Sequence, residues 1–92
     1  MKAVGLDPKQ DLAFSDASGA NLSYQDYSDA NLEGCMLVSA NLEKAIFSGA
    51  NLRDADLSNA SSVHARFQLA ILSGANLSGA NLSEIESIRG RS

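Results

Sequence analysis

Apolar and polar residues along this chain repeat with a period of five. From Gln10 onward, the sequence divides into sixteen consecutive five-residue units without an insertion. The first residue of a unit is alanine in eleven cases, the second is Asn or Asp in ten, and the third is leucine in ten and aromatic in three. A fixed period of this kind indicates a repeat architecture and decides the fold class.

A period of five is compatible with neither a regular helix nor a regular strand. On an α-helix, five residues advance the chain by about 500°, so the leucines would spiral around all faces. On a strand, an odd step would send successive leucines to opposite sides of the sheet. The chain must therefore turn once in each unit.

The positions within a unit predict which side chains are buried. The first and third residues point to the same side of a short extended segment, while the second and fourth point to the other side. We therefore expect Leu57, a third-position residue, to point inward and Ser58 beside it to point outward. The fifth position carries five of the seven glycines as well as Asp29, Asp54 and Asn59, and such residues tolerate turns with positive φ. Each unit should form one side and one corner of a coil.

The aromatic residues predict how many sides the coil has. Tyr27, Phe47 and Phe67 occupy third positions and are spaced by twenty, which aligns them in one column only if a coil has four sides. We therefore expect an all-β solenoid of about four coils, about 19 Å tall at ~4.8 Å per layer. The predicted inward columns are Leu12/Leu32/Leu52/Leu72, Ala17/Leu37/Leu57/Leu77, Leu22/Leu42/Ser62/Leu82 and Tyr27/Phe47/Phe67/Ser87.

The Ala-Asn-Leu-x-x and Ala-Asp-Leu-x-x units closely resemble the pentapeptide-repeat family over residues 10–89. The resemblance implies a right-handed quadrilateral β-helix with four units per coil, in agreement with the aromatic spacing. It also implies no catalytic machinery and no cofactor. The predicted organisation is an N-terminal segment at 1–9, a pentapeptide-repeat solenoid at 10–89 and a C-terminal tail at 90–92.

Several residues depart from the family pattern. Ala17 and Ser62 occupy inward third positions where Leu or Phe is usual, and the pattern dissolves at Ser87. Phe14 is out of phase as a core residue. Either it folds over the open end of the solenoid, or the register slips in the first coil.

The single cysteine and the single histidine of the sequence do not indicate a catalytic or metal site. Cys35 is the single cysteine and should be a small buried hydrophobe, while His64 falls at a solvent-facing corner. A nucleophilic Cys–His pair needs the two groups within hydrogen-bond reach, and a structural zinc site needs about four ligands. We expect no catalytic residues, no metal site and no bound cofactor.

The charge pattern argues against direct nucleic-acid binding. Between Asp11 and Glu86 there are ten acidic residues against Lys44, Arg53 and Arg66, so the solenoid carries a charge of about −7. Proteins bind nucleic acids chiefly through Lys and Arg side chains that neutralise phosphates. An acidic rod could instead imitate DNA and bind a type II topoisomerase such as gyrase, as one branch of the family does, although that branch has features not evident here. The charges for that alternative are Asp26, Asp29, Glu33, Glu43, Asp54 and Asp56.

Outward apolar residues predict a protein partner. Clusters of apolar side chains on a surface mark interaction sites more often than scattered ones do. The candidate contact residues fall into two groups, Met36, Val38 and Ile46, and Val63, Leu69 and Ile71. The ends of a solenoid also expose core residues, so we expect a homodimer formed through Ile85 and Ile88.

The sequence thus predicts a non-catalytic protein-interaction or scaffold module whose partner it does not identify. No apolar run exceeds four residues and the N-terminus lacks a secretory stretch, so we expect a cytoplasmic protein that does not enter a membrane. A DNA-mimicking topoisomerase binder and a structural fragment of a larger repeat protein are the alternatives.

Overall fold

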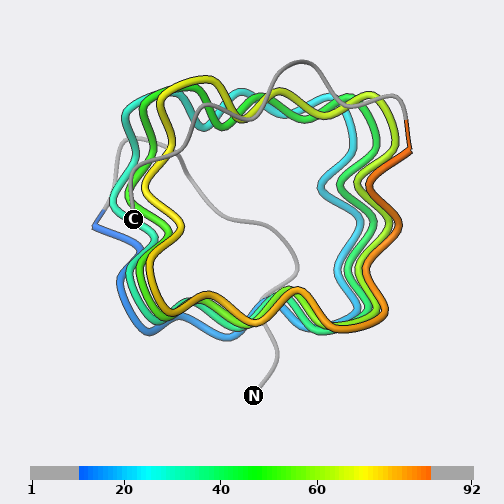
Figure 1. Cartoon of the computed structure of the whole chain (residues 1–92), viewed down its shortest axis with the longest axis horizontal. Coiled ribbons are helices and arrows are strands. Elements are labelled where there is room, and N and C mark those ends of the chain that lie inside the picture. The colour runs from blue at the N-terminus through cyan, green and yellow to red at the C-terminus, as the bar shows by residue number, and fades with distance from the viewer. Residues whose placement is uncertain (1–10, 84–92) are drawn as a thin grey trace.

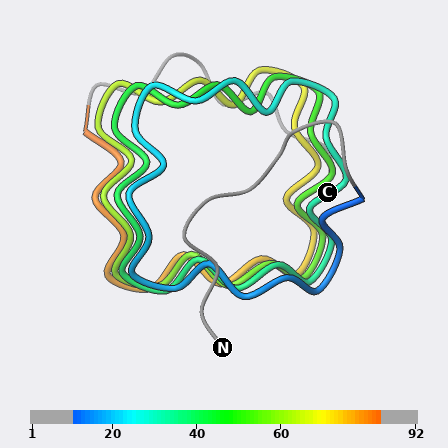
Figure 2. The same cartoon turned by 180° about the vertical axis from the view of Figure 1, so that it is seen from behind.

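The chain winds into a coil with four nearly equal sides. The computed structural model describes residues 11–83, and successive turns overlay on a near-square outline when seen along the solenoid (Figure 1) and from its other end (Figure 2). Residues 11–83 contain no helix and no strand longer than a single bridge residue. Parallel bridges join residues twenty apart, as in Asp16–Met36, Met36–Asp56 and Asp56–Asn76. The prediction of four units per coil is therefore confirmed. In addition, no helix in this range is long and apolar enough to cross a membrane.

Within the described residues, three backbone hydrogen bonds join units that are stacked in consecutive coils. Leu32, a third-position residue, donates its N–H to the carbonyl of Asn51 at 2.8 Å, and Gly34 at the fifth position donates to Arg53 at 2.7 Å. In the other direction, the N–H of Asn51 at a second position donates to Ala30 at 2.9 Å. Because each unit repeats these bonds, the backbone is held as a continuous ladder around the solenoid.

Each corner is a tight turn with its bend at the fifth position. Every fifth-position residue from Phe14 to Gly79 has a positive φ, between 59° and 74°. The following N–H closes the turn, as where Ala40 donates to the carbonyl of Leu37 at 3.0 Å. A positive φ at the third residue of a four-residue turn is typical of type II geometry. The predicted corner position is confirmed.

The preference for Asn or Asp at the second position has a local cause that the periodicity alone did not reveal. In each such unit, the side-chain Oδ1 accepts the N–H of the fourth residue, for example from Ser18 to Asp16 at 3.0 Å and from Arg53 to Asn51 at 3.1 Å. This Asx bond stabilises the entry to the corner turn. All ten Asn and Asp residues at second positions within 11–83 make it.

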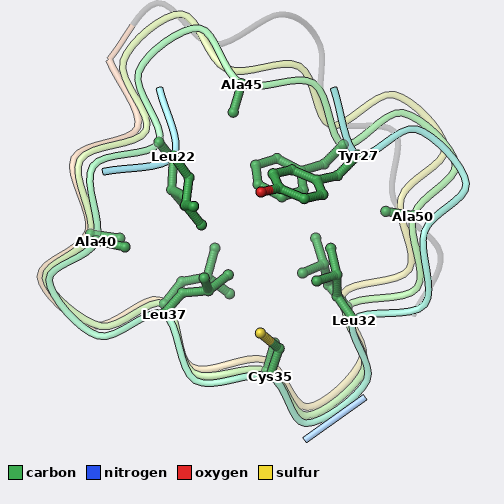
Figure 3. Packing of buried hydrophobic residues seen from close by; sticks show 14 of the residues in the cluster. Leu22, Tyr27, Leu32, Cys35, Leu37, Ala40, Ala45 and Ala50 are labelled. Atoms are coloured by element: carbon green, nitrogen blue, oxygen red, sulfur yellow. The ribbon is translucent and has the colours of Figure 1, made fainter. Parts of the chain in front are cut away.

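Third-position side chains fill the centre of the coil, and first-position side chains pack between them. Figure 3 shows Leu22, Tyr27 and Leu37 directed to the middle, with the smaller Cys35 and Ala40 nearer the wall. The third-position residues from 12 to 67 are all buried. Leu12 is among them, so the register does not slip in the first coil, and Phe14 lies at a corner with 73% of its surface exposed. Of the predicted columns, only Ser87 falls outside the described residues.

The aromatic column forms a continuous stack through the core. The ring centroids of Tyr27 and Phe47 are 5.6 Å apart with an interplanar angle of 14°, and those of Phe47 and Phe67 are 5.3 Å apart at 11°. Offset stacking at such separations is favourable beyond the burial of the rings. The spacing of twenty residues in sequence therefore becomes direct contact in the structure.

Ser62 is the one polar side chain in the core of the described residues. It occupies the column of Leu22, Leu42 and Leu82, and its Oγ is buried without a hydrogen-bond partner. A buried hydroxyl that loses its water without gaining a partner is destabilising by about 1–3 kcal/mol.

We expect the substitution Ser62→Ala to stabilise the fold. Removing the unpaired hydroxyl should raise the free energy of unfolding by about 1 kcal/mol, or roughly 4–8 °C in melting temperature. Thermal unfolding followed by circular dichroism measures this. Ser78→Ala, at an exposed outward position, is the matched control and should leave the melting temperature nearly unchanged. A loss of stability in Ser62→Ala would show that the hydroxyl has a partner.

The four sides are numbered in chain order, so side 1 faces side 3 and side 2 faces side 4. Within the described residues, side 1 comprises 11–14, 30–34, 50–54 and 70–74, side 2 comprises 15–19, 35–39, 55–59 and 75–79, side 3 comprises 20–24, 40–44, 60–64 and 80–83, and side 4 comprises 25–29, 45–49 and 65–69.

Candidate functional site

Outward side chains also form columns, and two adjacent columns differ from the rest of the solenoid. The corner between sides 3 and 4 carries Tyr24, Lys44 and His64. The first outward column of side 4, next to this corner, carries Asp26, Ile46 and Arg66, which are bridged in that order. We call the four residues Lys44, Ile46, His64 and Arg66 the corner array.

The three residues of this corner column adopt a backbone conformation that their side chains disfavour. Tyr24, Lys44 and His64 have φ values of 66°, 59° and 60°. Each of the other three corner columns contains glycine as well as an Asp or Asn, the residues that tolerate positive φ. Bulky residues in this conformation are strained by on the order of 1 kcal/mol each. Within the described residues, this is the corner column that contains no Gly, Asn or Asp.

The neighbouring column also departs from the repeat. Ile46 and Arg66 stand at second positions, where an Asn or Asp would accept the N–H of the fourth residue. Neither side chain has an oxygen acceptor, so both units forgo the Asx bond. Positions that break a local structural rule are expected to be enriched in functional residues.

The corner array surrounds a shallow depression of about 300 Å³. Its four lining residues form a two-by-two arrangement, with Lys44 and Ile46 on the second coil and His64 and Arg66 on the third. The Nζ of Lys44 lies 5.4 Å from the centroid of the Tyr24 ring, within the range of a cation–π contact. This contact places the Lys44 ammonium beside the Tyr24 ring.

Positive charge is concentrated at this corner although the solenoid is acidic. Residues 11–83 contain three Lys and Arg residues, and two of them, Lys44 and Arg66, belong to the corner array together with the single His64. Both cationic side chains are exposed. A local cationic surface on an acidic protein can attract an anionic group at short range.

Asp26, the carboxylate in the column of Ile46 and Arg66, accepts hydrogen bonds from a residue of its own coil. Asp26 Oδ1 accepts hydrogen bonds from the Ser28 hydroxyl and from the Ser28 N–H, the latter at 2.9 Å. These bonds hold the pKa of Asp26 below its usual value of 3.8, and the corresponding bonds from Ser58 lower the pKa of Asp56. The Asp26 carboxylate is thus an Asx acceptor for its own turn.

Acidification should reduce stability through these two carboxylates. Because the pKa values of Asp26 and Asp56 are lowered in the folded state, the stabilisation is present above the unfolded pKa of 3.8 and is lost as the pH falls through the folded pKa. The double variant Asp26→Asn/Asp56→Asn keeps the Oδ1 acceptors but does not titrate. Its melting temperature should fall less than that of the wild type between about pH 5 and pH 2.5. Parallel falls would contradict the role assigned to these bonds.

The profile for pentapeptide repeats, in eight copies, matches residues 18–54, 28–61 and 50–85. The chain belongs to the pentapeptide repeat family. Its fold is accordingly the right-handed quadrilateral β-helix of these proteins, as the resemblance implied.

Three solved pentapeptide repeat proteins are similar to this chain. One from the thylakoid lumen of Arabidopsis thaliana is 35% identical over 88% of this chain and 57% of its own, with a TM-score of 0.83. HetL, involved in heterocyst differentiation regulation in the cyanobacterium Nostoc, is 38% identical over 87% and 40%, with a TM-score of 0.62. Another Nostoc protein is 31% identical over 83% and 64%, with a TM-score of 0.51. This chain therefore spans 40% to 64% of their lengths, and no curated protein matches it.

In this pentapeptide repeat solenoid, each of the two predicted groups of apolar contact residues is divided between sides. Met36 and Val38 share side 2, whereas Ile46 lies on the opposite side 4. Leu69 lies at the corner between sides 4 and 1 and Ile71 lies next to it on side 1, whereas Val63 lies on side 3, opposite to side 1. Ile46 is the one that joins the corner array.

The six acidic residues considered for DNA mimicry are likewise distributed over the whole repeat solenoid. Within the described chain, every side carries at least one of them: Asp26 and Asp29 on side 4, Glu33 and Asp54 on side 1, Asp56 on side 2 and Glu43 on side 3. No one side presents them together as a duplex-like face. Ile85 and Ile88, the predicted dimer contacts, lie outside the described residues.

Cys35 and His64 differ in burial, because the thiol lies in the core and the imidazole lies at the surface. Cys35 is fully buried on side 2, and burial raises the pKa of its thiol to about 11, with a smaller contribution from the charge of Asp16. His64 is exposed at the corner of sides 3 and 4. Residues 11–83 contain no group of three or more His, Cys, Asp or Glu side chains arranged to hold a metal ion.

Sequence reasoning had not selected Tyr24, Lys44, His64 and Arg66 as a site. A signal was nevertheless present, because these residues occupy equivalent or adjacent positions of units twenty residues apart and depart from the repeat there. Their contact around a shared depression depends on how the corner folds and on the direction of the side chains.

Proposed function

We propose that this pentapeptide repeat protein is a non-catalytic scaffold that holds a protein partner on its outer surface. The carrying observation is the corner array, where bulky and cationic side chains replace the residues that the repeat itself favours. A backbone bonded from coil to coil holds these side chains at a fixed spacing, as in other solenoids that bind proteins.

A role without catalysis is supported by the character of the candidate nucleophiles. The buried Cys35 is held as a neutral thiol by its raised pKa, whereas the nucleophilic form is the thiolate. Serine hydroxyls such as those of Ser28 and Ser58 donate to the carboxylates of their own turns. These hydroxyls stabilise corners, and the carboxylates that accept them have lowered pKa values and are therefore weak bases.

Side-specific photo-crosslinking in the cells that produce the protein tests the scaffold proposal. A photoreactive amino acid is placed at one outward position per side, at Arg53, Val38, Glu43 or Gln68. We expect one protein to be captured from one side or from two adjacent sides, and the purified partner to bind the full chain. Equal capture from all four sides, or none above the unlabelled control, would contradict the proposal.

Two further predictions about this protein stand beside the scaffold role. The cytoplasm is the predicted compartment, and immunolocalisation against marker proteins tests it, since one structural relative comes from the thylakoid lumen. The homodimer through Ile85 and Ile88 is tested by sedimentation of the full chain at increasing concentration.

A further inference from the structure

We propose that the corner array binds a carboxylate group presented by an acidic segment of a protein partner. This inference rests on the proposed scaffold function and names the chemistry of the bound group. Lys44 and Arg66 supply two cationic donors on consecutive coils, and both line the same depression. A guanidinium and an ammonium are the side chains that bind carboxylates most strongly in proteins.

The arrangement of the four residues fits a carboxylate carried on an apolar stem. Lys44 and Arg66 occupy one diagonal of the two-by-two array, while Ile46 and His64 occupy the other. The charged group would lie between the cations, and its methylene carbons would pack on Ile46. A depression of about 300 Å³ is large enough for a Glu or Asp side chain and lies at the lower end of ligand-pocket sizes.

The surroundings limit how tightly an anion can bind. Glu43 precedes Lys44 on side 3, and Asp26 is next to Ile46 in its column, although its Oδ1 is bonded to Ser28. In the sequence, Glu84 follows His64 by twenty residues and Glu86 follows Arg66 by twenty. Exposed ion pairs are individually weak and the array supplies only two cations, so the affinity for a short peptide should be weak, on the order of 1 mM or weaker.

A synthetic peptide ligand measures how much the carboxylate contributes to binding. The peptide Ac-Gly-Leu-Glu-Gly-Leu-Glu-amide is titrated into the ¹⁵N-labelled full chain, and the same peptide with Gln in place of Glu is the control. We expect saturable shifts of the amide signals of Lys44, Ile46, His64 and Arg66. The Gln peptide should bind at least about fivefold more weakly, and binding should weaken as salt is added.

Protein variants assign the binding to the array. Lys44→Gln/Arg66→Gln should lower the affinity for the Glu peptide at least about fivefold, whereas Arg53→Gln, which removes an exposed cation from side 1, should not change it. The variant Glu84→Gln/Glu86→Gln should bind at least as tightly as the wild type. Unfolding curves of all variants should match that of the wild type.

Three outcomes would overturn the inference. These are equal shifts from the Glu and Gln peptides, an undiminished affinity of Lys44→Gln/Arg66→Gln, and equal or tighter binding of inorganic phosphate, which would indicate a general anion site. None of these outcomes contradicts the scaffold function. If Lys44→Gln/Arg66→Gln captured the crosslinked partner as well as the wild type does, the partner would bind another surface of the scaffold.

Discussion

Replacing Leu57 by aspartate should abolish the cooperative unfolding transition. Leu57 is fully buried in the third coil, in the column of Leu37 and Leu77. Loss of a buried leucine alone destabilises a fold by about 2–5 kcal/mol, and burial of an unpaired carboxylate adds several more. The total stability of a domain is only about 5–15 kcal/mol. Circular dichroism on heating should therefore show no folded baseline for Leu57→Asp.

Gln68→Asp is the matched control for this substitution. Gln68 is exposed at an outward position of the same coil, so the new charge remains in water and the melting temperature should change little. Ser58 is less suitable, because its Oγ donates to Asp56 Oδ1 at 2.7 Å and an aspartate there would face that carboxylate. If Leu57→Asp melted like the wild type, the assignment of inward and outward positions would be wrong.

Truncation of Phe47 to alanine should cause the second large loss of stability. Phe47 is buried and lies between the rings of Tyr27 and Phe67, at centroid distances of 5.6 and 5.3 Å. Removal of a buried phenylalanine costs about 3–5 kcal/mol, which includes the cavity and the lost ring contacts. At about 4–8 °C per kcal/mol, the melting temperature should fall by roughly 12–40 °C.

Phe14→Ala is the control for the aromatic column. Phe14 has 73% of its surface exposed at a corner, with its ring lying over Gly34 of the next coil. Its truncation removes little buried surface and should shift the melting temperature by only a few degrees. Similar losses in Phe14→Ala and Phe47→Ala would mean that the stack does not stabilise the core.

The inward-facing residues could be predicted because positions that must be apolar recur with the period of the repeat. Tyr27, Phe47 and Phe67 are twenty residues apart, and their spacing alone required four sides. The same argument placed Leu12 in the core. It left the position of Phe14 open, because an aromatic residue at a turn position contradicts the expectation that large apolar side chains are buried.

The outward half could be predicted only in part. Solvent accepts almost any side chain, so outward positions follow the period less strictly than inward ones. Met36 and Ile46 are ten residues apart, which is half a coil, and they therefore lie on opposite sides. Nearness in sequence therefore put Met36 and Ile46 in one predicted group, although the coil holds them apart.

The sequence by itself determined the period, the number of sides, the corner position and the core columns of this pentapeptide repeat protein, because each follows from a repeated requirement for burial or for positive φ. Tertiary structure alone decided which outward side chains contact one another. Lys44, Ile46, His64 and Arg66 line one depression because a corner brings adjacent units together and a backbone ladder stacks consecutive coils. Lys44 lies against Tyr24, and Asp26 is bonded to Ser28, because of side-chain directions that the five-residue period does not specify.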